Sequence, residues 1–193
     1  MDKISNRGVK DLPFTREEHD DLVIKFCDML EKAGIVITEE EKKAVSISDF
    51  NLNMFPTIGL EVLEYINTDR YCAKELVLFP NQICPEHRHP EVDGRKGKQE
   101  TFRCRWGEVY LYVPGEKTKN AKGKVPPSKE NTFRVWHEIV LKPGEQYTIP
   151  SDTLHWFQGG PEGAIVSEFS STSSDENDIF TDEEIIRHPK FLD

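Results

Sequence analysis

Four side chains in the middle of the sequence have the types and the spacing of a metal site. His87 and His89 stand two residues apart, so on an extended strand their imidazoles lie on the same face. Glu100 adds a carboxylate and His155 a third imidazole if neighbouring strands bring them together. Three neutral imidazoles and one carboxylate suit a divalent first-row metal, with positions left for a substrate. We therefore predict that these residues hold Mn, Fe, Co, Ni or Zn inside a β-barrel.

The elements that must position these residues are short strands. After residue 51, short apolar runs alternate with turn residues, and no helices are interleaved between them. This texture predicts a mainly β fold, either a sandwich or a closed barrel. The predicted strands cover residues 58–62, 76–79, 83–89, 98–106, 108–113, 132–141, 145–150, 154–158 and 163–170.

Helices are predicted only towards the ends of the chain. Capping boxes, in which a threonine hydroxyl and a glutamate satisfy free amide groups, predict helices over residues 15–33 and 38–45. The last residues predict a short, capped, acidic helical tail. We expect a single domain with three parts, a helical segment over 1–50, a barrel over 51–172 and the tail over 173–193.

One long insertion interrupts the predicted strands. Residues 114–131 are rich in lysine and carry several prolines. They are compatible with a mobile lid near the site or with a solvated hairpin loop, and we favour the hairpin loop.

Composition limits the classes of function. The 193 residues are 36% hydrophobic and 31% charged, typical of an ordinary globular domain. A formal net charge of -10 argues against nucleic acid or an anionic membrane as the main partner. No apolar run approaches the roughly 18 residues of a membrane span, and no secretion signal is evident. Four cysteines without a CxxC pair favour free thiols, so we expect a cytoplasmic protein.

Two motifs resemble those of the cupin family. The first is His-x-His, a spacer, Glu, six residues and Gly, here ending at Gly107, although the ten-residue spacer is longer than usual. The second is Gly, five residues, Pro-x-Gly, two residues and His. It runs here from Gly144 through Pro150 to His155, with Asp152 in place of the second glycine. The resemblance implies a jelly-roll-like cupin barrel, with His87, His89, Glu100 and His155 as metal ligands.

A narrower resemblance covers nearly the whole chain. The sequence looks like a cupin-type D-lyxose ketol-isomerase, which implies an aldose–ketose isomerase acting on a monosaccharide. That family interconverts chiefly D-lyxose with D-xylulose, and often D-mannose with D-fructose, using Mn(II) in a homodimer. The segments that carry the resemblance are residues 71–74, 84–89, 97–102, 135–138, 155–157, 167–171 and 178–182.

Such a reaction also needs a group that moves a proton. A transfer between C1 and C2 through an enediol requires a general acid/base, and a carboxylate is the natural choice. Glu168, on a late predicted strand, is similar to the family's carboxylate, and we predict that it is the base. Lys98 shares the inward face with Glu100, and Lys74 precedes an apolar strand. Either lysine could stabilise charge on a substrate oxygen. The sequence does not choose between proton transfer through an enediol and a metal-assisted hydride shift.

Three other functions are compatible with the same ligands. Three histidines and a glutamate also suit an Fe(II)-dependent cupin oxygenase. A phosphosugar isomerase would need a cationic pocket, and the lysines of residues 117–129 are the only obvious source. A non-catalytic sugar-binding cupin would hold no metal and turn over no sugar.

Overall fold

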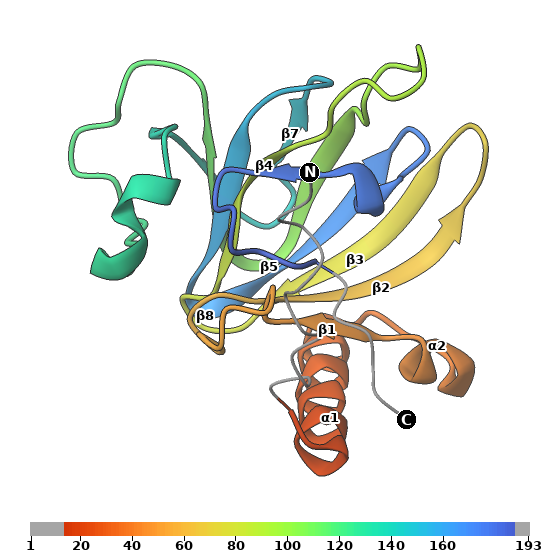
Figure 1. Cartoon of the computed structure of the whole chain (residues 1–193). Helices are drawn as coiled ribbons and strands as arrows, with labels where there is room; N and C mark the ends of the chain where they lie inside the picture. Colours follow the sequence, from red (N-terminus) through yellow and green to blue (C-terminus); the bar gives the residue numbers. More distant parts are fainter. Residues whose placement is uncertain (1–13, 188–193) are drawn as a thin grey trace, which may run out of the picture.

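A curled antiparallel sheet forms the centre of the computed structural model, which describes residues 14–187 (Figure 1). The sheet follows the order β1-β2-β3-β8-β4-β9, and β5 pairs with β6, β7 and β8. The long strand β8 therefore contacts three neighbours and joins the two halves of the sheet. The strands are β1 (Ser46–Ser48), β2 (Leu60–Asn67), β3 (Cys72–Leu78), β4 (Ile83–Arg88), β5 (Glu100–Val113), β6 (His137–Leu141), β7 (Gln146–Ile149), β8 (His155–Ser170) and β9 (Ile179–Phe180). The mainly β fold is confirmed.

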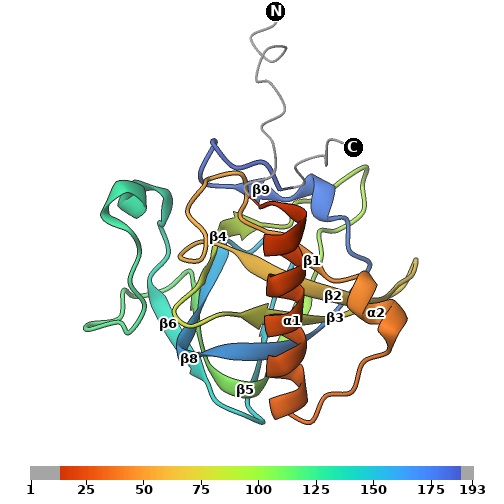
Figure 2. The ribbon, with the colours of Figure 1, turned by 90° about the horizontal axis from the view of Figure 1, so that it is seen from below.

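Two helices precede most of the sheet, as predicted. Helix α1 (Arg16–Lys32) begins at the capping box, where the Glu18 amide donates to Thr15 Oγ1 at 3.2 Å. Helix α2 (Glu39–Lys43) begins at a second capping box and ends two residues earlier than predicted. Figure 2 shows α1 lying across β2, β3 and β8.

The alternation of side chains along β2 and β3 gives the sheet two apolar faces. Leu60, Leu76 and Leu78 belong to the cluster inside the barrel. Leu63 and Val77 point the other way and belong to a second cluster. The buried stripe of α1 packs in this second cluster, and burial of each such large side chain contributes roughly 1.5–3 kcal/mol. That stripe consists of Leu22, Phe26, Met29 and Leu30.

Two pairs of predicted strands are single long strands in the structure. Residues 98–106 and 108–113 join in β5, and residues 154–158 and 163–170 join in β8. The pairing between β5 and β8 shifts its register on both sides of Gly107, which has φ 69°. A Cβ at Gly107 would lie only 2.1 Å from the carbonyl oxygen of Gly163, so the two strands need a glycine there. The glycine marks a bulge in a continuous strand, where the sequence analysis predicted two separate strands.

The predicted helical tail is wrong over its described residues. The segment holds a 3-10 turn, η2 (Asp175–Asn177), and the strand β9, which pairs with β4. Residues 188–193 lie outside the described residues, and the proposed division into three parts stays a prediction.

The long insertion connects two paired strands, as the preferred prediction of a hairpin loop requires. Strands β5 and β6 pair antiparallel from Val109↔Leu141 to Val113↔His137. The connection carries the 3-10 helix η1 (Pro127–Thr132), so the strand predicted from residue 132 begins later, at His137. Tyr112 ties the loop to the sheet, since its hydroxyl donates to Glu138 Oε1 at 2.5 Å and accepts from the Gly123 amide at 2.6 Å.

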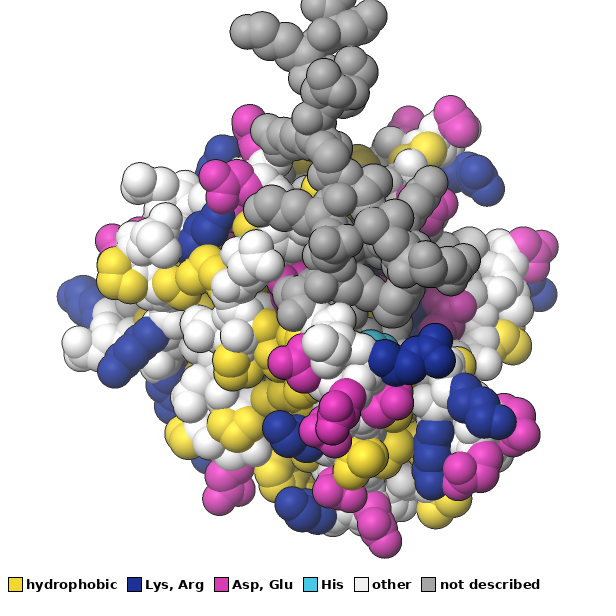
Figure 3. Space-filling view, turned by 60° about the horizontal axis from the view of Figure 1, so that its bottom comes forward, with side chains coloured by type: hydrophobic (Ala, Val, Ile, Leu, Met, Phe, Trp, Pro, Cys, Tyr) yellow, Lys and Arg dark blue, Asp and Glu magenta, His cyan; other side chains and the backbone are white. Residues whose placement is uncertain are grey.

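The surface carries charges of both signs. On the face in Figure 3, acidic and basic side chains are interleaved, with hydrophobic side chains between them. Over residues 14–187, neither helix has the length and apolar character needed to cross a bilayer.

Candidate metal centre and active site

The strand pairing brings the predicted site residues into one place. In the β4–β8 ladder His87 stands opposite His155, and in the β3–β8 ladder Lys74 stands opposite Glu168. Glu100 begins β5 and pairs with the end of β8. All of these side chains are buried, so their polar atoms must be satisfied within the barrel.

The three predicted histidines form one cluster. One ring nitrogen from each of His87, His89 and His155 lies within 4.8 Å of the others. His87 Nδ1 lies 2.7 Å from the carbonyl oxygen of Pro85, and His155 Nδ1 lies 2.9 Å from that of Thr153. Because a carbonyl only accepts, both Nδ1 atoms carry the proton and donate, which leaves each Nε2 with a free lone pair. Both rings therefore present a ligand atom.

Glu100 supplies the observation that tests whether a cation fits here. Its Oε1 lies 2.9 Å from His155 Nε2 and 3.3 Å from His89 Nε2. His155 Nε2 is buried and has no hydrogen-bond partner within the described part of the chain, so its short contact with the carboxylate joins two acceptors. Two facing lone pairs repel unless a positive charge lies between them. The arrangement is consistent with a divalent metal held by these residues.

The charges of the cluster follow from its surroundings. Burial, together with the neighbouring histidines, lowers the pKa of His87 well below its usual value, so this ring is neutral as a ligand must be. Burial alone would also lower the pKa of His89, but Glu100 and Asp178 raise it to about 9. Burial opposes ionisation of Glu100 as well, yet Lys98 and His89 hold the pKa of this carboxyl well below its usual range. Without a metal ion the site thus pairs a cationic His89 with the ionised Glu100, and a metal ion bound there would replace the proton on His89 Nε2.

Lys98 joins the ligand cluster to the predicted base. Its Nζ lies 2.8 Å from Glu100 Oε2 and donates to Glu168 Oε1 at 2.9 Å. Burial would lower the pKa of Lys98, but the two carboxylates raise it well above the usual value. The lysine is therefore a fixed cation between two carboxylates, and it orients Glu168 towards the cavity.

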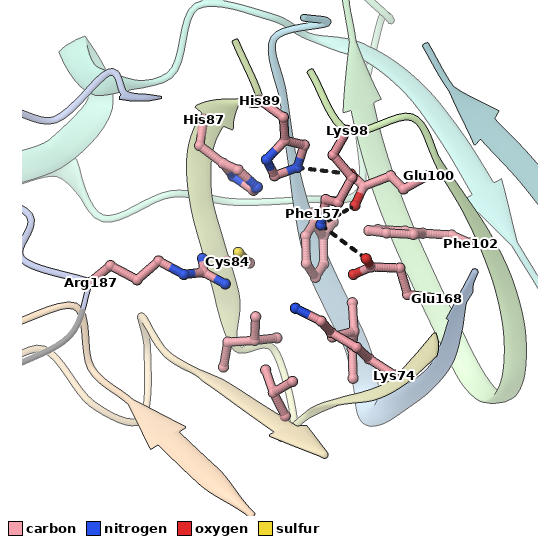
Figure 4. Close-up of a pocket in the computed structure, with 13 residues that line it drawn as sticks. Lys74, Cys84, His87, His89, Lys98, Glu100, Phe102, Phe157, Glu168 and Arg187 are labelled. Carbon is pink, nitrogen blue, oxygen red and sulfur yellow. Dashed lines mark hydrogen bonds and ion pairs between the residues drawn. The ribbon is translucent and has the colours of Figure 1, made fainter. Parts of the chain in front are cut away.

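Figure 4 shows the cavity that these side chains line. Lys74 enters from β3, Glu168 from β8 and Lys98 from the segment just before β5, while Arg187 reaches in from the C-terminal segment. His155 lies against this set through its contact with Glu100. Every predicted site residue therefore lies in or against one cavity. Its lining is Leu60, Val62, Lys74, Leu76, Cys84, His87, His89, Lys98, Glu100, Phe102, Phe157, Glu168 and Arg187.

The C-terminal segment supplies residues that the sequence analysis missed. Arg187 lines the cavity, and its Nη2 donates to Asp175 Oδ2 at 2.9 Å. Asp175 also accepts from Lys74 Nζ at 2.9 Å, which offsets burial and, with Glu168, raises the pKa of Lys74. Lys74 has a structural ion pair in addition to its place in the cavity. The only signal for this network was a run of acidic residues over 175–184 followed by Arg187, and it resembled an exposed acidic helix.

The ten-residue spacer of the first motif forms a loop at the mouth of the barrel. Val92 and Arg95 pair across a tight turn at Asp93 and Gly94, whose φ values of 51° and 74° suit a two-residue hairpin. At the far end of the loop a Cβ on Gly97 would lie 1.8 Å from the carbonyl oxygen of His89. The loop therefore leaves the ligand strand and returns into contact with it before Glu100.

The fold and these residues define a cupin-type barrel with a candidate metal centre. The L-ribose isomerase of Acinetobacter sp. DL28, solved in complex with L-ribose, matches it with a TM-score of 0.73. The match covers 89% of this chain and 94% of that one, and at 16% identity it shows the fold alone. The L-ribose isomerase of Cellulomonas parahominis gives a TM-score of 0.72 at 15% identity, with the same coverage of both chains.

Sequence comparison identifies the family within this class. The family model described as D-lyxose isomerase matches residues 36–193. A D-lyxose ketol-isomerase of Thermofilum sp. (strain ex4484_79) is 65% identical over 168 residues, 87% of this chain and 93% of the relative. A D-lyxose/D-mannose isomerase of Thermosediminibacter oceani is 62% identical over 169 residues, 88% of this chain and 93% of the relative. The chain belongs to the D-lyxose isomerase family, and it is an isomerase that interconverts aldose and ketose sugars.

Proposed function

We propose that the chain interconverts D-lyxose and D-xylulose, and also D-mannose and D-fructose, in a metal-dependent reaction. Relatives named for D-lyxose and for D-lyxose/D-mannose support the choice of sugars. The observation that carries the proposal is the convergence of three imidazoles and Glu100 beside the Lys98–Glu168 pair in one cavity.

His87, His89, Glu100 and His155 would hold the metal ion. When bound, a divalent ion supplies Lewis acidity that polarises the carbonyl group of the sugar. The local backbone orients the rings of His87 and His155 through their Nδ1 atoms, so both Nε2 atoms are already aimed at the centre. We propose Mn²⁺ as the preferred ion, with Fe, Co, Ni or Zn as substitutes.

Glu168 would carry the proton between the two carbons. In the aldose its carboxylate removes the proton from C2, and the bonding electrons form the C1–C2 double bond of an enediol. The same carboxyl then returns the proton to C1, while a hydroxyl proton moves from O2 to O1 and leaves a carbonyl group at C2. No atom is gained or lost, and the carboxylate is regenerated.

Lys98 and Lys74 would assist Glu168. Lys98 holds Glu168 in place through its 2.9 Å hydrogen bond, and its buried ammonium stabilises negative charge that develops on a sugar oxygen. Lys74 lies opposite Glu168 on the neighbouring strand and keeps a second positive charge near this carboxylate. Both lysines are held in position before a substrate binds, because their partners are part of the fold.

The test is to remove metal with a chelator, restore one metal at a time, and assay free pentoses and hexoses for ketose formation. We expect activity to be lost with the metal, restored best by Mn²⁺, and present without O₂. Turnover that requires O₂ would refute the proposal in favour of an oxygenase. Turnover of phosphorylated sugars alone would refute the preference for free sugars. Full activity after complete metal removal would refute the metal dependence.

We further propose that the protein is a cytoplasmic homodimer. Tyr71 and Phe169 are each 51% exposed and line one groove on the outside of β3 and β8, where a second copy would cover them. The described cysteines are all free thiols, which suits a reducing compartment. Light scattering coupled to gel filtration tests the dimer, and a monomer at micromolar concentration would refute it. Subcellular fractionation tests the compartment, and recovery outside the cytoplasmic fraction would refute that part.

A further inference from the structure

The three histidines of the cluster are not oriented in the same way. His87 and His155 each donate from Nδ1 to a backbone carbonyl two residues earlier in the chain. His89 departs from this pattern, because its Nδ1 contacts the carboxylate of Asp178. Two rings are therefore oriented by the backbone just before them and the third by a distant segment.

Strand pairing explains how that segment reaches His89. In the β4–β9 ladder His87 stands opposite Phe180, and Arg88 stands opposite Ile179. The next positions along this ladder are His89 and Asp178. The ring of Phe180 also stacks on His87, with centroids 5.3 Å apart and 29° between the planes. The C-terminal segment thus contacts two of the three imidazoles.

Asp178 is itself held by a chain of opposite charges. Its side chain is only 3% exposed, and its Oδ2 lies 3.4 Å from Arg187 Nη1. Arg187 also binds Asp175, which in turn binds Lys74 on β3. These cations lower the pKa of Asp175 against the effect of burial, and Asp175 and Asp178 raise that of Arg187. A buried carboxylate without such partners would be costly, so the network fixes Asp178 beside His89.

We propose that Asp178 is a positioning residue for the metal ligand His89 and that Arg187 keeps it in place. The inference rests on the metal centre proposed above. A carboxylate that accepts from Nδ1–H selects the tautomer whose Nε2 is the ligand atom and fixes the plane of the ring. It also makes Nε2 a stronger donor to a metal, a contribution that a backbone carbonyl provides more weakly. Over its described residues, the C-terminal segment therefore supplies no proposed metal ligand itself but positions one of the ligands.

Metal affinity of the full chain tests the proposal directly. Asp178→Ala removes the acceptor, and Asp178→Asn keeps an acceptor oxygen but removes its charge. Loss of such a partner typically weakens metal binding about 10–100-fold, so we expect that loss for Asp178→Ala and a smaller one for Asp178→Asn. Mn²⁺ dissociation constants are measured by electron paramagnetic resonance on protein first stripped of metal.

The matched control is Asp182→Asn. Asp182 lies in the same segment, is buried, and accepts from Lys129 Nζ at 2.7 Å, but it contacts none of the histidines. We expect this variant to bind Mn²⁺ as the wild type does. The melting temperature of each metal-free variant separates a loss of folding from a loss of affinity.

The outcomes are distinguishable. If wild-type protein binds neither Mn²⁺ nor another divalent ion, the proposed metal centre fails, and this inference fails with it. If the wild type binds and Asp178→Ala binds within twofold of it, the centre stands and the positioning role is refuted. Equal losses for Asp178→Asn and Asp182→Asn would also refute the role, because they would reflect a loosened segment. If Asp178→Ala does not fold, Asp178→Asn decides between the same outcomes.

Discussion

The buried ionisable groups on the two faces of strands β2 and β3 have different kinds of partner. Inside the barrel Lys74 projects from β3 among carboxylates, and Lys98 joins Glu100 to Glu168. On the outer face, next to the cluster under α1, the same two strands bury Glu61 and Glu75. Both faces exclude water, so burial alone does not account for the difference between them.

The outer carboxyl groups have neutral partners. Glu61 is fully buried, and its Oε1 accepts from Gln82 Nε2 at 3.0 Å, while Oε2 has no hydrogen-bond partner among residues 14–187. Burial raises the pKa of Glu61 to about 8. Burial also raises the pKa of Glu75, although Ser167 donates to it at 2.7 Å and Arg105 lies nearby.

A fixed cation is what separates the two faces. Glu100 is as buried as Glu61, yet its pKa is lowered because Lys98 and His89 outweigh the loss of solvation. In a barrel of low dielectric constant, a pair of fixed opposite charges decides the charge state that burial alone would reverse. The inner face thus keeps Glu100 ionised beside Lys98, while burial on the outer face favours the protonated forms of Glu61 and Glu75.

The largest expected effect comes from removing the charge of the proposed base. Glu168→Gln should lower kcat about 10²–10⁴-fold, because the amide cannot accept a proton. Mn²⁺ affinity should be nearly unchanged, since the described ligand cluster does not include this residue. Steady-state assays with D-lyxose, together with metal titration, measure both quantities. Glu162→Gln, at an exposed position of the same strand, is the control. Full activity in Glu168→Gln would remove it as the base.

The next largest effect is a loss of folding stability when the buried cation Lys98 is removed. Lys98→Met leaves Glu100 and Glu168 facing each other without their shared partner, a change that costs about 3–5 kcal/mol in buried pairs. Urea unfolding of metal-free protein measures the loss. The double variant Lys98→Met with Glu168→Gln should recover part of it, because one of the two unpaired charges is gone. A double variant no more stable than Lys98→Met would show that the carboxylates do not depend on this cation.

On the outer face, removing a buried ionisable group is expected to stabilise the protein rather than destabilise it. The folded state holds the Glu61 proton up to about pH 8, whereas the unfolded chain releases it near 4.5. Between these values the unfolded state binds fewer protons, so wild-type stability falls as pH rises. Glu61→Gln removes this dependence and should gain about 3 kcal/mol relative to the wild type between pH 4.5 and pH 7. Urea unfolding at both pH values gives the result. A constant difference between the two proteins would contradict the raised pKa.

The smallest effect is expected at Glu75. Ser167 donates to it and Arg105 lies nearby, so its charged form is better supported than that of Glu61. Glu75→Gln should therefore change stability with the same dependence on pH but by only about 1 kcal/mol. The same unfolding series measures it. If Glu75→Gln changed stability more than Glu61→Gln does, the hydrogen-bonding partners of the two carboxyl groups would not explain the relative size of the two effects.

The sequence was sufficient for the parts of the site that local patterns encode. The spacing of His87 and His89 on one strand face and the two motifs around them predicted the cluster that the structure brings together. The capping boxes likewise predicted the starts of both helices. The β4–β9 pairing was not predictable, because it joins segments about 90 residues apart and β9 has only two residues. With that pairing missed, Asp178 and Arg187 were hidden in what looked like an acidic helix.

The loop between His89 and Glu100 offers a place where the protein can be altered without disturbing its chemistry. Gly97 returns the chain to the backbone of His89 so tightly that no larger residue fits, whereas Gly94 at the turn has open space around it. The turn at Asp93 and Gly94 can therefore be lengthened while the ligand strand stays in register, provided that residues at positive φ remain ones that tolerate it. The entrance of the barrel could be redesigned for other sugars by grafting at Asp93-Gly94, as long as the glycine at position 97 is kept.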